Sequence, residues 1–150
     1  MSILKLLIYP DKKLRKIAKP VKKINYVIKQ NIKNMFKTMY KKKGIGLAAT
    51  QININKQIIV IDISKNKNKN IVLINPIIIN KYGDYSINEG CLSIPKYYAY
   101  IKRAKKIIVK AININNKIYI FKAKNLLAVC IQHEIDHLLG RLFIDYLPLF

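Results

Sequence analysis

The feature that most constrains this chain is a short sequence near its C-terminal end, His133-Glu134-Ile135-Asp136-His137. Apolar residues recur around it at helical spacing, which predicts a helix from about Leu126 to Leu139 that stops at Gly140. Residues four apart lie on one face of a helix. Two imidazoles so placed can hold one metal ion, and the glutamate beside them can reach a water on that ion. The chain's only two histidines both lie here, which argues against a chance match.

A catalytic metal site of this kind needs a third protein ligand and one open position. The longer H-E-x-x-H-x-x-G-x-x-H pattern would require histidine where this chain has Phe143, and the only acid after His137 is Asp145. The two cysteines remain. Cys130 lies about 7 Å along the helix axis from the level of the imidazoles, too far for a short side chain, whereas Cys91 follows a glycine on a separate segment. The residues alone favour Cys91 and leave Cys130 as the alternative.

The rest of the chain predicts one more helix and several short strands. Apolar residues recur at i, i+3, i+4 and i+7 between Ile24 and Met39, which predicts an N-terminal amphipathic helix that closes at Gly44. Strand patterns cover residues 57–63, 71–79, 107–114 and 117–122, with a hairpin turn at Asn115-Asn116 and an exposed loop at 65–70. We therefore predict an α+β fold, with mixed or antiparallel short sheets packed around a central metal-binding helix, in a single domain spanning residues 1–150.

The composition indicates where such a protein works. No stretch approaches the roughly 18 apolar residues of a membrane span, and the N-terminal apolar run is too short for a signal peptide. We therefore expect a soluble, cytoplasmic protein with no membrane partner.

The net charge of +22 raises the question of a nucleic-acid partner. The chain has 30 Ile, 26 Lys and 15 Asn but only three Arg. Ile, Lys and Asn share A/T-rich codons, so a biased genome explains the charge more simply than specific recognition, which favours the forked guanidinium of arginine. We expect non-specific attraction to RNA or to the ribosome surface at low salt and no specific nucleic-acid partner.

Three segments together resemble the signature motifs of bacterial peptide deformylases. They are Gly44-Ile45-Gly46-Leu47-Ala48-Ala49-Thr50-Gln51, Glu89-Gly90-Cys91-Leu92-Ser93 and Gln132-His133-Glu134-Ile135-Asp136-His137. The resemblance runs from Ile3 to Leu147. It implies an enzyme that removes the N-formyl group from the initiator methionine of nascent polypeptides and releases formate. It also implies one Fe(2+) per chain, held by Cys91, His133 and His137. Zinc, nickel or cobalt can occupy the same donor set, and the residue types select none of them.

The resemblance also implies roles for further residues. Glu134 would act as general base and then general acid, with a metal-bound water or hydroxide as the nucleophile. The side-chain amide of Gln51 and the backbone N–H of Leu92 would stabilise the oxygen that gains charge, each by about 3 kcal/mol. Glu89 would pair with Arg103 through a buried bidentate contact. The residues expected to bind the substrate are Ile45, Gly46, Ile87, Gly90, Leu126, Val129 and Cys130. Asp136 is expected behind the ligands or in a capping position.

Two departures and two rival interpretations accompany this resemblance. Asn125 stands where the family usually has glycine, a mild change because Asn tolerates a left-handed backbone. Family members often continue into a C-terminal helix that contacts the ribosome; here the lysine-rich surface is expected to supply part of a transient contact.

One rival is a metallopeptidase with the same metal chemistry. The other is a basic RNA-binding protein with a structural metal, which would need a fourth protein ligand, and none is evident in the sequence.

Overall fold

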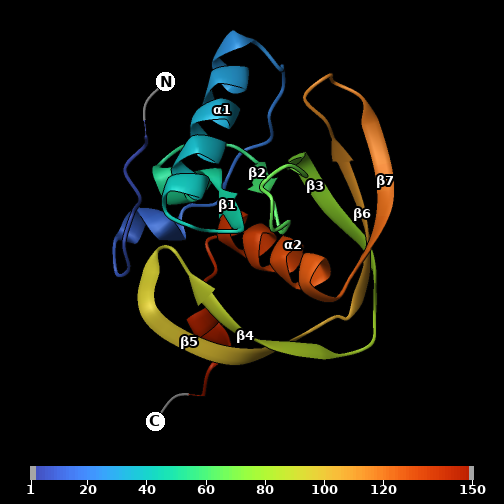
Figure 1. Cartoon of the computed structure of the whole chain (residues 1–150). Coiled ribbons are helices and arrows are strands. Elements are labelled where there is room, and N and C mark those ends of the chain that lie inside the picture. Colours follow the sequence, from blue (N-terminus) through green and yellow to red (C-terminus); the bar gives the residue numbers. More distant parts are fainter. Residues whose placement is uncertain (1–2, 149–150) are drawn as a thin grey trace.

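The computed structural model describes residues 3–148 (Figure 1). Along the chain come the helices and strands η1 (Lys12–Arg15), α1 (Tyr26–Lys41), β1 (Gly46–Ala48), η2 (Ala49–Ile52), β2 (Ile58–Ile61), β3 (Ile71–Tyr82), β4 (Tyr85–Cys91), β5 (Ile94–Arg103), β6 (Lys106–Ile112), β7 (Ile118–Lys124), α2 (Asn125–Leu138) and η3 (Phe143–Tyr146), where η marks a 3-10 helix. Five strands form one sheet in the order β1-β2-β3-β6-β7, and β4 and β5 form a second. All neighbouring strands are antiparallel.

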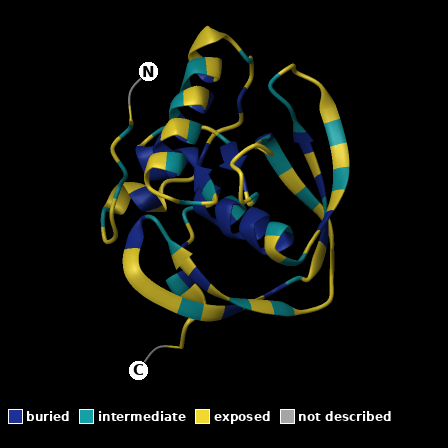
Figure 2. Cartoon of the chain, in the orientation of Figure 1, coloured by how far each residue is buried: buried dark blue, intermediate teal, exposed yellow. Residues whose placement is uncertain are grey.

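Helix α2 lies in the middle of the molecule and contacts strands of both sheets (Figure 1). Ten of its 14 residues are buried, and the helix forms a dark band across the centre of Figure 2. A helix that is enclosed on several sides has no broad face in contact with solvent. Its sequence therefore carries few charged residues outside the segment from His133 to His137. None of the helices within residues 3–148 is long and apolar enough to cross a membrane.

Strand β2 joins the two main parts of the core. All four of its residues are buried. Side chains alternate along a strand, so Ile58 and Val60 pack with the α1 side of the core, while Ile59 and Ile61 pack with the α2 side. The five-stranded sheet is therefore covered by a helix on each face at this point, and β1, beside β2, is held firmly next to α2.

The structure confirms the predicted α+β class and both predicted helices. The four predicted strands correspond to β2, β3, β6 and β7, and the hairpin turn lies where expected, with Asn116 at φ 63°. Strand β3 continues through Asn75-Pro76, where its register with β6 shifts at a bulge. The expected left-handed backbone at Asn125 is also present, at φ 56°.

Three strands were not predicted from the sequence: β1, β4 and β5. Strand β1 is only three residues long, too short for an alternating pattern. In the β4–β5 hairpin, Glu89 and Arg103 are buried where apolar residues would be expected. The pattern of alternating apolar residues that marks a half-buried strand is therefore interrupted.

Helix α2 ends in a Schellman motif centred on Gly140. Gly140 has φ +74°, its N–H donates to the carbonyl of His137 at 3.0 Å, and the N–H of Arg141 donates to the carbonyl of Asp136 at 2.8 Å. A Cβ added at Gly140 would lie 2.4 Å from the carbonyl oxygen of Arg15. The stop predicted from the sequence is thus a glycine required both by backbone conformation and by space.

Helix α1 ends in the same motif with a different residue at its centre. The N–H of Lys43 donates to the carbonyl of Tyr40 at 3.0 Å, and that of Gly44 donates to the carbonyl of Met39 at 2.9 Å. The left-handed residue is Lys43, with φ 61°, and not Gly44 as the sequence pattern had indicated. At Gly44 an added Cβ would lie 2.6 Å from Cδ1 of Leu92, so the Leu92 side chain would have to move to accept it.

The two roles of Gly140 can be separated by comparison with Gly83, which has φ +67° but only the Lys105 side chain nearby, at 3.4 Å from an added Cβ. Gly83→Ala is expected to cost about 1 kcal/mol, from the left-handed backbone alone. Gly140→Ala adds a steric overlap with backbone and is expected to cost about 3 kcal/mol. Urea unfolding of both variants measures the difference; equal losses would contradict the steric argument.

Candidate metal centre and active site

Three side chains that can ligate a metal meet between β4 and α2. Cys91 is the last residue of β4, and His133 and His137 are one turn apart on α2. Their ligand atoms all lie within 4.8 Å of one another. Sγ of Cys91 is 3.3 Å from Nε2 of His137, which is 3.3 Å from Nε2 of His133. Two imidazole nitrogens bound to one tetrahedral metal stand about 3.3 Å apart, so this donor set fits a divalent transition-metal ion.

Cys130, the alternative considered from the sequence, is not in this cluster. It is buried on α2, and its sulfur faces β1, where a Cβ added at Gly46 would lie 2.8 Å from it. Burial, together with the nearby carboxylates of Glu134 and Glu89, raises the pKa of the Cys130 thiol well above its ordinary value. A neutral thiol in an apolar wall is the state that this environment favours.

Glu134 lies beside the cluster without belonging to it. It is 4% exposed, and its Oε1 has no hydrogen-bond partner among the described residues. Burial raises the pKa of this carboxyl to about 7, although the positive charges of His133 and Arg103 oppose the shift. A Cβ at Gly46 would lie 2.6 Å from Oε2 of Glu134. Only glycine therefore allows β1 to pass this close to the carboxylate.

A buried carboxylate orients one of the two imidazoles. Oε1 of Glu89 is 2.9 Å from Nδ1 of His133, which leaves Nε2 of that ring facing the cluster. Glu89 also accepts two hydrogen bonds from Arg103, 2.5 Å from Nε and 2.9 Å from Nη2. Burial alone would raise the pKa of Glu89, but the contacts with His133 and Arg103 outweigh it and lower the pKa. An ionised carboxylate behind a metal-binding histidine fixes both its tautomer and its orientation.

Arg103 connects this carboxylate to a second one. Its Nη1 donates to Oδ2 of Asp136 at 2.9 Å, and the hydroxyl of Tyr146 donates to the same oxygen at 2.8 Å. The ring of Tyr146 also lies against the guanidinium, with 5.3 Å between its centroid and Cζ. The sequence pointed to Glu89, Arg103 and Asp136, but not to Tyr146, which lies in an unremarkable C-terminal stretch.

Gln51 approaches the cluster from η2. Its Oε1 accepts from the N–H of Ala48 at 2.9 Å, so its amide nitrogen faces the opposite way, toward Oγ of Ser93 at 3.0 Å and Sγ of Cys91 at 3.6 Å. The adjacent Thr50 donates to the carbonyl of His137 at 3.1 Å. The helical turn η2 is thus attached to α2, and the amide nitrogen of Gln51 is held beside the cluster by its contacts with Ser93 and Cys91.

A cavity of about 380 Å³ opens over these groups. The residues expected to bind substrate all line it, namely Ile45, Gly46, Ile87, Gly90, Leu126, Val129 and Cys130. Cys91, His133, Glu134, Gln51 and Leu92 also line it, whereas His137 and Arg103 lie behind its wall. The cavity therefore combines an apolar wall with polar groups gathered at one end, the usual form of a small-ligand site.

Four further lining residues were not expected from the sequence: Lys43, Gly44, Asn88 and Tyr98. The ring of Tyr98 lies over Gly90, with Cε1 only 2.5 Å from where a Cβ would be. A glycine in the second signature segment was a signal that something packs closely there, but nothing in the spacing identified Tyr98. Without a pattern for β5, the sequence could not place its side chains.

Within this network, a substitution of Arg103 is expected to lower the free energy of unfolding more than a substitution of any other member. Arg103→Leu leaves two buried carboxylates without their cation, which typically costs about 3–5 kcal/mol. The neighbouring Lys102→Leu is a matched control, because Lys102 is 74% exposed and forms only a surface pair with Asp84 at 3.4 Å; such pairs contribute about 0–1 kcal/mol. Chemical unfolding measures both. Similar small losses in the two variants would show that the network does not stabilise the fold.

Comparisons with known proteins identify the family of this chain. The family model described as polypeptide deformylase matches residues 3–149. The peptide deformylase of Wigglesworthia glossinidia brevipalpis is 59% identical over 147 residues, which cover 98% of this chain and 97% of that protein. The peptide deformylase of Buchnera aphidicola subsp. Acyrthosiphon pisum (strain Tuc7) is 57% identical over 150 residues, covering 100% of this chain and 87% of that protein.

A solved structure extends the agreement to three dimensions. The crystal structure of a peptide deformylase from Legionella pneumophila superposes with a TM-score of 0.95 at 45% identity, covering 98% of this chain and 87% of that chain. Sequence and fold therefore lead to the same conclusion. The chain belongs to the polypeptide deformylase family, the enzymes that remove the N-formyl group from nascent polypeptides.

Proposed function

We propose that this deformylase acts on the initiator formyl-methionine with one divalent metal ion per chain, held by Cys91, His133 and His137. The observation that carries the proposal is the meeting of one thiol and two imidazole nitrogens within 4.8 Å, beside a cavity with an apolar wall. Fe(2+) is the proposed native ion, with zinc, nickel or cobalt as substitutes, since the donor set suits all four. We further propose that it acts as a single catalytic domain in the cytoplasm, where nascent chains emerge.

The reaction adds water to the formyl carbon and breaks the bond between that carbon and the methionine nitrogen. A bound divalent ion supplies Lewis acidity, which polarises a carbonyl and lowers the pKa of water to about 7. Glu134 lies next to the proposed ligands, and its Oε1 has no partner in the part of the chain that the structure describes. It takes the proton of the attacking water and delivers it to the departing amine. Formate and a free N-terminal methionine are the products.

Two donors stabilise the negative charge that develops on the formyl oxygen. The amide nitrogen of Gln51 points toward Cys91, because its oxygen is held by the N–H of Ala48. The backbone N–H of Leu92 is the second proposed donor, on the residue that follows Cys91. A preformed donor of this kind contributes about 3 kcal/mol to the transition state.

The substrate's methionine side chain fills the apolar part of the cavity between β1, β4 and α2. The substrate's backbone has two strand edges available, because within residues 3–148 β1 pairs only with β2, and β4 pairs only with β5. An extended peptide can add to such an edge through main-chain hydrogen bonds, without regard to most of its side chains. This arrangement favours methionine in the first position and allows varied residues after it.

Glu134→Gln tests the proton-transfer role. The variant keeps the size of the side chain and all three proposed ligands, so it is expected to bind metal with the same stoichiometry as the wild type. Formate release from a formyl-methionyl peptide is expected to fall by about 10²- to 10⁴-fold. Metal content by elemental analysis and formate by a coupled assay are the two readouts. Retained activity in a metal-loaded variant would refute the role of Glu134.

The same assay separates this proposal from a metallopeptidase with equal metal chemistry. The metal-loaded wild type is expected to release formate from formyl-methionyl peptides and to leave acetyl-methionyl peptides and internal peptide bonds intact. Cleavage of internal bonds at a comparable rate would favour the peptidase.

We also propose a transient contact with the ribosome surface. The chain carries 29 Lys and Arg against 7 Asp and Glu, and such a surface is attracted to RNA mainly through counterion release. Co-sedimentation with ribosomes is expected at 50 mM salt and to weaken by an order of magnitude or more at 200 mM. Binding that is insensitive to salt would point to a shape-specific contact instead.

A further inference from the structure

Among the residues that the structure describes, one cationic side chain lines the outer end of the cavity, that of Lys43. The other charged lining residues are His133 and the carboxylates Glu89 and Glu134, and both carboxylates are only 4% exposed. Lys43 itself is exposed. Asn88 and Tyr98, the remaining polar residues of the outer wall, are neutral. An incoming peptide therefore meets a single accessible charge at this end of the cavity, and that charge is positive.

The place of Lys43 is set by the end of α1. Its own N–H and that of Gly44 close the Schellman motif on Tyr40 and Met39, and its φ of 61° is the left-handed value that the motif requires. Strand β1 begins three residues later, at Gly46, and is paired with the buried strand β2. Lys43 thus joins two fixed elements, and its Cα cannot move far from the cavity.

The direction of β1 indicates which part of a substrate passes Lys43. Gln51, whose amide faces Cys91, follows β1 in the chain, whereas Lys43 precedes it. A peptide with its formyl group at Cys91 and its backbone along β1 therefore runs antiparallel to the strand, toward Lys43. At about 3.4 Å per residue, the second and third residues of the peptide reach this end of the cavity.

We propose that Lys43 is a specificity-determining residue that favours acidic side chains, and disfavours basic ones, at the second and third positions of the formyl-methionyl substrate. The inference rests on the proposed function, since it supposes a formyl-methionyl peptide in this cavity. The lysine ammonium attracts a carboxylate and repels another ammonium in the same place. Its effect is on binding and approach of the substrate, not on the chemical step.

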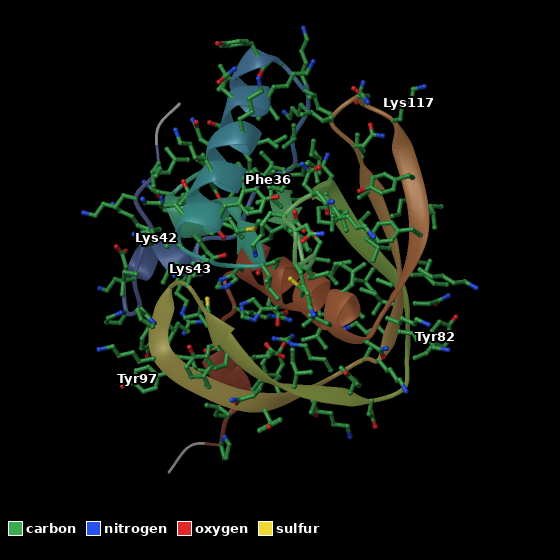
Figure 3. All side chains as sticks on the ribbon, in the orientation of Figure 1. Phe36, Lys42, Lys43, Tyr82, Tyr97 and Lys117 are labelled. Atoms are coloured by element: carbon green, nitrogen blue, oxygen red, sulfur yellow. The ribbon has the colours of Figure 1, made fainter. Side chains whose placement is uncertain are left out.

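The net charge of +22 is the competing explanation, because any acidic peptide is attracted to so basic a protein. Two other lysines separate the two effects. Lys42 is the neighbour of Lys43 but lines a different cavity, with Leu6 and Pro95. Lys117 lies at the turn between β6 and β7. Figure 3 shows Lys42 and Lys43 together at the end of α1 and Lys117 at the far side of the molecule.

The experiment compares formate release from formyl-Met-Ala-Glu, formyl-Met-Ala-Gln and formyl-Met-Ala-Lys by the metal-loaded full chain at low salt. The wild type is expected to show a kcat/KM about five-fold higher for the Glu peptide than for the Lys peptide, carried mainly by KM. Lys43→Glu is expected to reverse this order. Asn suits a left-handed backbone, so Lys43→Asn removes the charge without straining the chain. This variant is expected to lower the ratio of kcat/KM for the Glu peptide to kcat/KM for the Lys peptide to the value that the protein's net charge produces by itself.

Lys42→Glu and Lys117→Glu change the net charge by the same amount as Lys43→Glu and are expected to keep the order of the wild type. A salt concentration of 0.5 M is expected to reduce the preference in all variants.

Equal rates for the three peptides in the wild type, or a loss of preference in Lys42→Glu or Lys117→Glu as large as in Lys43→Glu, would overturn the role of Lys43. Activity on the neutral Gln peptide would still stand in that case and support the proposed function. No formate from any of the three peptides would overturn the proposed function and this inference together.

Discussion

The position of the candidate metal centre depends on one buried guanidinium. Arg103 lies on β5, yet its contacts join β4 to α2 through Glu89 and Asp136. Ile94 and Ile101 of the β4–β5 hairpin pack in an apolar cluster with Leu14, Leu142 and Phe143. The ionic contacts add a direction-dependent attachment, because the fork of the guanidinium donates two hydrogen bonds to Glu89 and a third to Asp136. Cys91 is brought to the two histidines by the same hairpin.

The sequence identified α2 and its chemistry because a helix repeats its pattern over several turns. The two histidines, with Glu134 between them, could be placed on one side of it from spacing alone. The preference for Cys91 over Cys130 rested on the short reach of the Cys130 side chain, and in the structure the sulfur of Cys130 lies toward Gly46 and not among the ligand atoms. The two predicted helices and the four predicted strands are observed for the same reason: each buries an apolar pattern long enough to detect.

The rest of the site could not be predicted, and the cause differs from residue to residue. Glu89 and Arg103 interrupt the pattern of the hairpin that holds them, so β4 and β5 went unrecognised although both residues were singled out. Tyr98 and Tyr146 act through packing that their local sequence does not signal: Tyr98 lies over Gly90 of the neighbouring strand β4, and Tyr146 lies against Arg103. Lys43 is one of 26 lysines, and in a chain so rich in lysine no composition-based argument distinguishes the one beside the cavity from the others.

The burial of α2 has a consequence for how this chain can change in evolution. One inserted or deleted residue turns all that follows it in a helix by about 100°, which would carry the imidazoles away from Cys91 and present an apolar face to Glu89. No repacking nearby could correct this, since ten of the 14 residues of α2 are buried. Variation in chain length should therefore be confined to outer connections, such as residues 65–70 and the turn at 113–117, while α2 keeps its register across homologues.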